Sequence, residues 1–410
     1  MTGKEDMTNI PQWIRAELFE NFVKEEFPNF HKISAFKVHS ALAPGENYAS
    51  NMLKVQLDIE MIDGSADKLT FMLKVPNKYE IMQEQWEAWG LFERESQMYN
   101  QIVPQFENLY KICGKDLKFG AKFYCLPVSD KHIMLEDLTR RGFKSLKRQD
   151  GLDMEHCKSV LKRMAQWHAA SAACIQLKDQ LTKMRGVLNV RAKDLLHQMF
   201  VDAMKGLLKA AKQLPRHQEY FDKLNNLSSN ILDKVYLNCQ WDESEFNVLN
   251  HGDCWSNNIM FQYDSESRLH ATYFVDLQVP LYGSPAMDLY YFILSSSKLD
   301  LKIAHFDEMI KYYHENLIEN LVLLKYEKDL PSLRHIHQML IKYGIWGIFT
   351  VSTIMAAALC EPTELANLDL LMGESEDSEK FKDHMFLNER YLEHLKLIIP
   401  WLNSRGGLDY

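Results

Sequence analysis

Apolar positions change their spacing several times along the chain, and each change predicts a different element. Over 13–27 they recur at helical spacing. Alternating apolar and polar positions then predict strands over 33–40, 52–62 and 69–75. The last two flank Asp63-Gly64-Ser65, and Asp-Gly is typical of a tight hairpin. The first part of the chain is therefore predicted to form a helix and an antiparallel meander of three strands.

Helical spacing dominates the rest of the chain. A helix is expected over 80–103, closed by Pro104, and two strands follow near 121–127 and 132–136. The later helices are expected over 154–174, 193–213, 218–238, 286–295, 303–324, 333–359 and 379–399, the last closed by Pro400. A short β insert is expected at 247–250, 259–262 and 272–276. A lobe boundary near 138–145 would divide a small β-rich N-lobe, 1–140, from a large helical C-lobe, 141–410.

Composition narrows the protein class. The 410 residues suffice for two or three domains or one two-lobed unit, and 46% hydrophobic with 25% charged residues is typical of a globular protein. The net charge of −9 argues against a nucleic-acid partner. No signal peptide or membrane span is expected, because no long apolar run occurs. The seven cysteines form no C-x-x-C pair, which favours reduced thiols and a cytoplasmic location.

The stretch with the clearest chemistry is His251-Gly252-Asp253-Cys254-Trp255-Ser256-Asn257-Asn258, between two predicted strands. It places a carboxylate on a loop and an amide five residues later. A second carboxylate, Asp276, follows a neighbouring strand. Carboxylate and amide oxygens suit Mg²⁺, and a remaining carboxylate can accept a proton from an alcohol. These are the groups that phosphoryl transfer requires.

The pattern H-G-D-x-W-x-x-N-x-M-F from His251, followed by D-x-Q at Asp276 and P-x-x-D-L at Pro285, resembles the insect ecdysteroid kinase-like family. That family is related to the aminoglycoside phosphotransferases and choline kinases. The resemblance implies an α+β, two-lobed, protein-kinase-like fold. It also implies that Asp253 orients or deprotonates the acceptor hydroxyl. The implied Mg²⁺ ligands are Asn258 and Asp276, and the implied supports of the loop are His251 and Asp288.

The same resemblance places a nucleotide against the N-lobe. Lys74, on the third strand, would hold the ATP phosphates and would pair with Glu95 on the following helix. A loop over the phosphates would contain Gly45, Asn47, Tyr48 and Ser50. It has a single glycine, so the assignment depends on the resemblance and not on a G-x-G-x-x-G motif. A hinge strand would present backbone groups to adenine near Glu136 and Leu138.

Each of these residues also has an ordinary interpretation. A single Asp, Asn or Lys is usually a surface or capping residue, and only the joint spacing favours a kinase-like loop. His168 is expected to be a satisfied core or interface histidine. Cys254 is not expected to be a nucleophile, because only His251 stands near it in the sequence. The absence of G-x-x-x-x-G-K, H-E-x-x-H and G-x-G-x-x-G argues against P-loop, zincin and dinucleotide-binding proteins.

The expected function is an ATP- and Mg²⁺-dependent kinase that phosphorylates a small alcohol. The resemblance suggests an ecdysteroid, which would be inactivated, or a hydroxylated xenobiotic, which would be detoxified. The acceptor would bind helices over 193–238 and 303–359, which are rich in large apolar residues. Two alternatives stay open: a choline or ethanolamine kinase, and a catalytically silent ligand-binding protein on the same fold. The oligomeric state is open as well.

Overall fold

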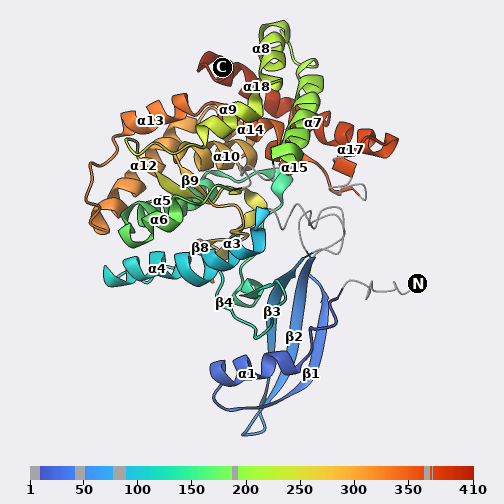
Figure 1. The fold of residues 1–410 in the computed structure, drawn as a ribbon, viewed down its shortest axis with the longest axis vertical. Coiled ribbons are helices and arrows are strands. Elements are labelled where there is room, and N and C mark those ends of the chain that lie inside the picture. Colours follow the sequence, from blue (N-terminus) through green and yellow to red (C-terminus); the bar gives the residue numbers. More distant parts are fainter. Residues whose placement is uncertain (1–9, 42–50, 77–88, 187–192, 364–369, 372) are drawn as a thin grey trace.

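The computed structural model describes residues 10–41, 51–76, 89–186, 193–363, 370–371 and 373–410 (Figure 1). Outside the described residues lie the proposed phosphate-loop residues Gly45, Asn47, Tyr48 and Ser50. The same holds for residues 80–88 of the helix expected over 80–103. Within the described parts, an antiparallel sheet is followed by a largely helical body, so the predicted two-lobed, kinase-like α+β fold is confirmed.

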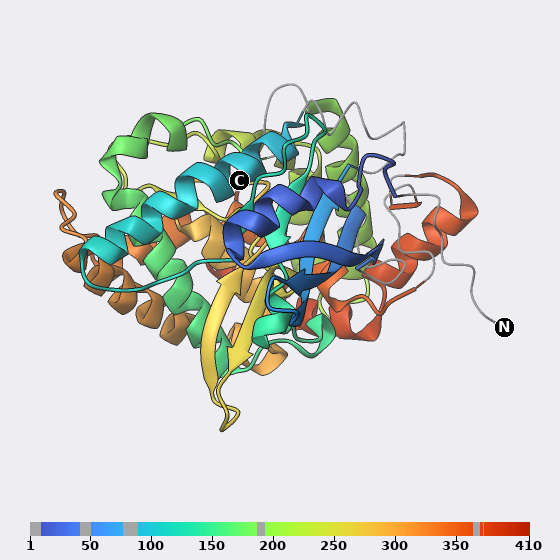
Figure 2. The same cartoon turned by 90° about the horizontal axis from the view of Figure 1, so that it is seen from below.

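The N-terminal sheet has five antiparallel strands in the order β1-β2-β3-β5-β4. Their bounds are β1 Phe30–Ser40, β2 Asn51–Met61, β3 Ala66–Val75, β4 Phe123–Tyr124 and β5 Ile133–Glu136. Helix α1 (Glu17–Glu26) lies across one face of this sheet (Figure 2). The predicted meander of three strands is therefore confirmed, and the later strands extend it.

The two faces of β3 serve different parts of the molecule, because successive side chains of a strand point to opposite faces. Phe71 and Leu73 belong to the apolar cluster shared with α1. Met72 packs against the core of the helical body, and Lys74 has the same strand parity as Met72. The lysine is thereby directed toward the body and away from α1.

Pro104 does not end the helix, contrary to the prediction. Helix α3 (Leu91–Gln97) widens into a π-helical segment, Met98–Ile102, and continues as α4 (Val103–Ile112). The N–H of Val103 bonds to the carbonyl of Met98, five residues back. This wider turn accommodates a proline at the start of α4, where its missing N–H costs little.

The helical body contains longer and shorter helices that pack around a second, larger core. They are α5 Met154–Ala173, α6 Lys178–Leu181, α7 Lys193–Ala211, α8 Gln218–Ser228, α9 Ile231–Asn238, α10 Ala286–Ser296, α11 Leu299–Lys302, α12 Phe306–Leu323, α13 Leu333–Lys342, α14 Ile345–Ser352, α15 Ile354–Leu359, α17 Glu376–Phe386 and α18 Glu389–Ser404. The expected long helices over 218–238, 333–359 and 379–399 are each divided, whereas the helix expected over 303–324 is the single helix α12.

Local breaks explain the shorter helices. Thr353, with φ −116° and ψ −92°, separates α14 from α15. Asn388 caps the start of α18 through its side chain, which accepts from the N–H of Tyr391. Pro400 lies inside α18, contrary to the prediction that it closes the helix. An interior proline costs about 3 kcal/mol, and burial of residues on both sides, including Ile399 and Leu402, offsets it.

Two small antiparallel sheets interrupt the helices and hold the chemically interesting stretch. Strand β6 (Val248–Asn250) pairs with β9 (Leu281–Gly283), and β7 (Ile259–Tyr263) pairs with β8 (Leu269–Phe274). Strand β9 was not predicted. It has only three residues, all buried, so it shows no alternation that could reveal it.

In the described part of the chain, no single helix has the length and apolarity needed to cross a membrane. One pair, Leu333–Lys342 with Ile345–Leu359, meets the criteria of length and composition only when joined, and it is bent by 62°. All seven cysteines are free thiols.

Candidate active site

The loop from His251 to Asn258 runs between β6 and β7, two strands that belong to different sheets. Gly252 has a φ of +81°, and a Cβ atom there would lie 2.0 Å from the carbonyl oxygen of Val279. Only glycine fits this position without moving the backbone. The N–H of Val275 bonds to the carbonyl of Asn258 at 3.0 Å. This bond places Asp276, the next residue, beside the end of the loop.

The side chain of Asp253 is held at both carboxylate oxygens. Asn258 donates from Nδ2 to Oδ2 at 2.8 Å, and the Tyr291 hydroxyl donates to Oδ1 at 2.5 Å. Burial and the nearby charge of Asp276 raise the pKa of Asp253 to about 7. Because the Asn258 amide nitrogen is engaged with Asp253, the Oδ1 of Asn258 is the atom left to bind a metal ion.

Lys74 connects the N-terminal sheet with the helical body through three partners. Its Nζ lies 2.7 Å from Glu95 Oε2, 2.7 Å from Asp276 Oδ1 and 3.2 Å from Gln278 Oε1. Gln278 Nε2 also donates to Asp276 Oδ2 at 3.2 Å. The lysine is only 4% exposed, so burial disfavours its charge, yet the Asp276 and Glu95 charges raise its pKa above the ordinary value.

Carboxylates outnumber ammonium groups in this cluster, since Glu95 and Asp276 both contact Lys74 and Asp253 lies within electrostatic reach of it. Burial, together with the charge of Asp276, raises the pKa of Glu95 to about 7 despite its contact with Lys74. Groups of three or more His, Cys, Asp or Glu with metal-site geometry do not occur among the described residues. Asn258 and Asp276 carry oxygen donors of the kind that Mg²⁺ takes, and Mg²⁺ needs few protein ligands because it keeps oxygens of its substrate in its shell.

The side chain of Asp288 holds the backbone of the loop that begins at His251. Its Oδ2 accepts from the N–H of His251 at 2.7 Å, and its Oδ1 accepts from the N–H of Gly252 at 3.0 Å. His168 Nε2 lies 3.3 Å from Asp288 Oδ2, and His168 Nδ1 lies 2.7 Å from the hydroxyl of Tyr313. His168 is thus a satisfied core histidine, as expected, and it steadies Asp288.

His251 bridges the loop and the neighbouring strand. Its Nε2 lies 3.0 Å from the carbonyl of Val275, and its Nδ1 accepts from the N–H of Asp253 at 3.3 Å. Because a carbonyl only accepts and an amide only donates, these partners assign the proton to Nε2. Burial lowers the pKa of His251, which keeps the ring neutral. The predicted supporting position of His251 and Asp288 agrees with these contacts.

Cys254 is fully buried, and burial raises the pKa of its thiol well above the ordinary value. A thiol in such surroundings stays protonated and is a poor nucleophile. These surroundings do not favour Cys254 as a nucleophile.

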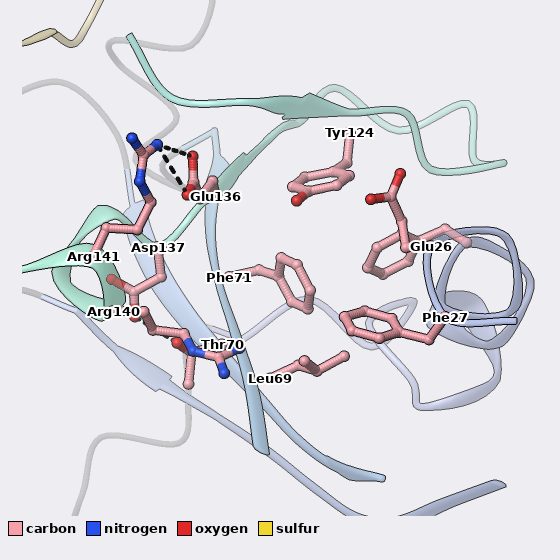
Figure 3. Close-up of a pocket in the computed structure, with 11 residues that line it drawn as sticks. Glu26, Phe27, Leu69, Thr70, Phe71, Tyr124, Glu136, Asp137, Arg140 and Arg141 are labelled. Carbon is pink, nitrogen blue, oxygen red and sulfur yellow. Dashed lines mark hydrogen bonds and ion pairs between the residues drawn. The ribbon is translucent and has the colours of Figure 1, made fainter. Parts of the chain in front are cut away.

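The proposed hinge residues lie at the C-terminal end of β5, an inner strand of the N-terminal sheet, and just after it. The side chain of Glu136 accepts from Arg141 and lines a cavity of about 330 Å³ (Figure 3). This cavity is bounded by Phe27 of the segment after α1 and by Phe71, which faces α1, so it lies on the face of β3 away from Lys74. Leu138 is buried and begins a short 3₁₀ helix, Leu138–Arg141. Their contact with adenine stays a prediction.

Two site residues were missed by sequence reasoning. Gln278 stands in the D-x-Q pattern, which marked the resemblance but assigned no role to this side chain. Tyr291 comes three residues after Asp288, one helical turn along α10. This spacing could have placed it beside the loop, yet tyrosines are so common in core helices that nothing in the sequence singled it out.

Comparison with protein-family models gives a match that covers the site. The model of the ecdysteroid kinase-like family matches residues 44–326, more than half of the chain. The match contains Lys74, Glu95 and the whole loop with Asp276 and Asp288. A search among curated proteins found no match. The chain belongs to the ecdysteroid kinase-like family.

Proposed function

We propose that the protein is an ATP- and Mg²⁺-dependent kinase that transfers the γ-phosphoryl group to a hydroxyl of a small molecule. The observation that carries this proposal is the bond between Lys74 and Asp276, residues 202 positions apart. It brings the group suited to triphosphate next to a carboxylate suited to Mg²⁺. Asp253, held by Asn258, completes the set that phosphoryl transfer to an alcohol requires.

The roles follow from the chemistry of each side chain. Lys74, oriented by Glu95, would bind the phosphates of ATP. Asn258 and Asp276 would hold Mg²⁺, which neutralises charge on the phosphates when it is bound. Asp253 would accept a hydrogen bond from the acceptor hydroxyl, and its raised pKa near 7 suits a base that works near neutral pH.

The proposed acceptor is a hydroxylated apolar compound, either an ecdysteroid or a xenobiotic alcohol. The family supports this class. A row of aromatic rings also leads from Asp253 into the helices where acceptor contacts were expected: Tyr291 contacts Phe349 of α14, which contacts Phe200 of α7. Such rings suit a largely apolar ligand. The proposal includes the cytoplasmic location suggested by the scattered cysteines.

The test is incubation of the purified protein with ATP, Mg²⁺ and ecdysteroids, choline and phenolic or glycosidic alcohols, followed by mass spectrometry. A phosphorylated apolar alcohol supports the proposal. Choline as the preferred acceptor would contradict the proposed apolar acceptor and indicate a choline-type kinase. Nucleotide binding without any product would favour a catalytically silent ligand-binding protein.

Asp253→Ala is the variant that tests the chemistry. Transfer should fall about 10²- to 10⁴-fold, because the hydroxyl loses its base, while nucleotide affinity measured by calorimetry should change little. Asp300→Ala, which removes an exposed carboxylate on α11, is the control and should keep full activity. Normal turnover by Asp253→Ala would refute the catalytic assignment.

A further inference from the structure

Helix α10 contacts the catalytic loop at two points one turn apart. Asp288 accepts from the loop backbone, as described above, and Tyr291 donates to the Asp253 carboxylate at 2.5 Å. Residues three apart on a helix share a face, so both groups approach the loop from the same side. One helical turn therefore holds the backbone of the loop and its reactive side chain together.

The hydrogen bond of Tyr291 differs from those of three other buried tyrosines in the molecule. Tyr290 donates to the carbonyl of Leu340, Tyr110 to that of Gln166 and Tyr391 to that of Val351. Those hydroxyls satisfy backbone groups inside the core. Tyr291 donates to an ionisable carboxylate at the centre of the site, and such charge-assisted bonds are shorter and stronger than neutral ones.

The ring of Tyr291 has little freedom to move. The residue is 7% exposed, and its ring centroid lies 6.4 Å from that of Phe349. Phe349 is held in turn by Trp346 at 4.9 Å and by Phe200 at 5.1 Å. The phenol is therefore a fixed donor, and it directs the carboxylate that it bonds.

Each of the two donors to Asp253 bonds a different oxygen of its carboxylate. Asn258 engages Oδ2 from the side of the loop that would face the metal ion, and Tyr291 engages Oδ1 from α10. Without either bond, the carboxylate could rotate about its Cβ–Cγ bond. A misplacement of about 1 Å at a reacting group can cost about 10²-fold in rate.

We propose that Tyr291 is a positioning residue for phosphoryl transfer: its hydroxyl fixes the carboxylate of Asp253 in the orientation that receives the acceptor hydroxyl. This inference rests on the proposed kinase function. Tyr291 acts through Asp253 and contacts no phosphate itself. Its removal should slow the transfer step and leave substrate binding nearly intact.

The test compares Tyr291→Phe with Tyr290→Phe, neighbouring variants that each remove one buried hydroxyl. Both lose one hydrogen bond, so both should lower the melting temperature by a similar small amount. Only Tyr291→Phe should lower kcat, by about 10- to 100-fold, with the KM for ATP and for the acceptor within about threefold of the unmodified protein. A purely structural role would change stability without this selective loss of kcat.

The outcomes separate the inference from the function on which it rests. If the unmodified protein transfers phosphate and both variants are equally active, the positioning role is refuted while the kinase function stands. A rise in KM with unchanged kcat would also refute it, since the tyrosine would then be a binding residue. If the unmodified protein phosphorylates no alcohol, the proposed function fails and the inference fails with it.

Discussion

Two lysines of this protein are buried to nearly the same degree but meet opposite surroundings. Lys74 is 4% exposed and touches Glu95 and Asp276, whereas Lys302 is 0% exposed and donates to the carbonyl of Leu294. Among the described residues, no carboxylate forms an ion pair with Lys302. The charges around Lys74 raise its pKa, and burial lowers that of Lys302 to about 7.

The difference shows how a buried charge can be kept for a ligand. The carboxylates around Lys74 keep it protonated at every physiological pH, so it can bind an anion as soon as one arrives. Lys302 has a neutral partner, and its nearest titratable neighbours in electrostatic effect are Cys157 and His394. Burial alone therefore does not mark a functional lysine; the charged partners do.

The largest effect is expected from Lys74→Met. Transfer should be lost, and stability should fall by about 3–5 kcal/mol, because Glu95 and Asp276 would be left without their cation. Urea unfolding and the transfer assay measure the two losses. The double variant Lys74→Met/Glu95→Gln should regain part of the stability and none of the activity. If Lys74→Met were stable and active, neither the two carboxylates nor phosphoryl transfer would depend on the charge of Lys74.

An opposite effect is expected from Lys302→Met. A buried ammonium group without a charged partner carries a desolvation cost that an apolar side chain of similar size avoids, so stability at pH 7 should not fall. Transfer activity should be unchanged. A loss of several kcal/mol by this variant would show that Lys302 has a stabilising partner after all.

The same lysine should make stability depend on pH. Its pKa is about 7 in the folded chain and 10.5 ordinarily, so the unfolded chain binds more protons between these values. The free energy of unfolding should therefore rise with pH across this window, by up to about 5 kcal/mol at 1.36 kcal/mol per unit. The effect is read as the difference between the parent protein and Lys302→Met at each pH, which cancels other titrations. An equal slope in both proteins would contradict it.

The smallest effect is expected from Gln278→Ala, which removes the neutral partner of Lys74. Stability should fall by about 1 kcal/mol, typical of one hydrogen-bonding side chain, and transfer should be weakened rather than lost. If this change were as severe as Lys74→Met, the neutral amide and not the carboxylates would determine the behaviour of Lys74.

Sequence reasoning found Lys74 because the order of strand, helix and loop around it matches the order in the family that the sequence resembles. Lys302 shows the limit of that reasoning. It stands in the four-residue α11, where no pattern distinguishes an exposed lysine from a buried one. Its burial arises from helices far away in the sequence, so only the folded chain reveals it.

The same limit applies to the elements themselves. Strong alternation predicted β1 to β3, and helical spacing predicted α5 almost to the residue. The two prolines misled because local rules end a helix at proline. In the folded chain, a π turn before Pro104 and core packing around Pro400 override those rules. Tyr291 was missed for a related reason, since its partner lies on another element.

The bond between Lys74 and Asp276 also has a consequence for how the chain is made. Synthesis runs from the N-terminus, and 202 residues separate the two partners. At about 5–20 residues per second, roughly 10–40 s pass before the ribosome adds Asp276 after Lys74. During that interval Glu95 is the only one of the two carboxylates available to Lys74. Until Asp276 has been synthesised and the helical body has folded, Lys74 of the nascent chain therefore lacks one of its two carboxylate partners.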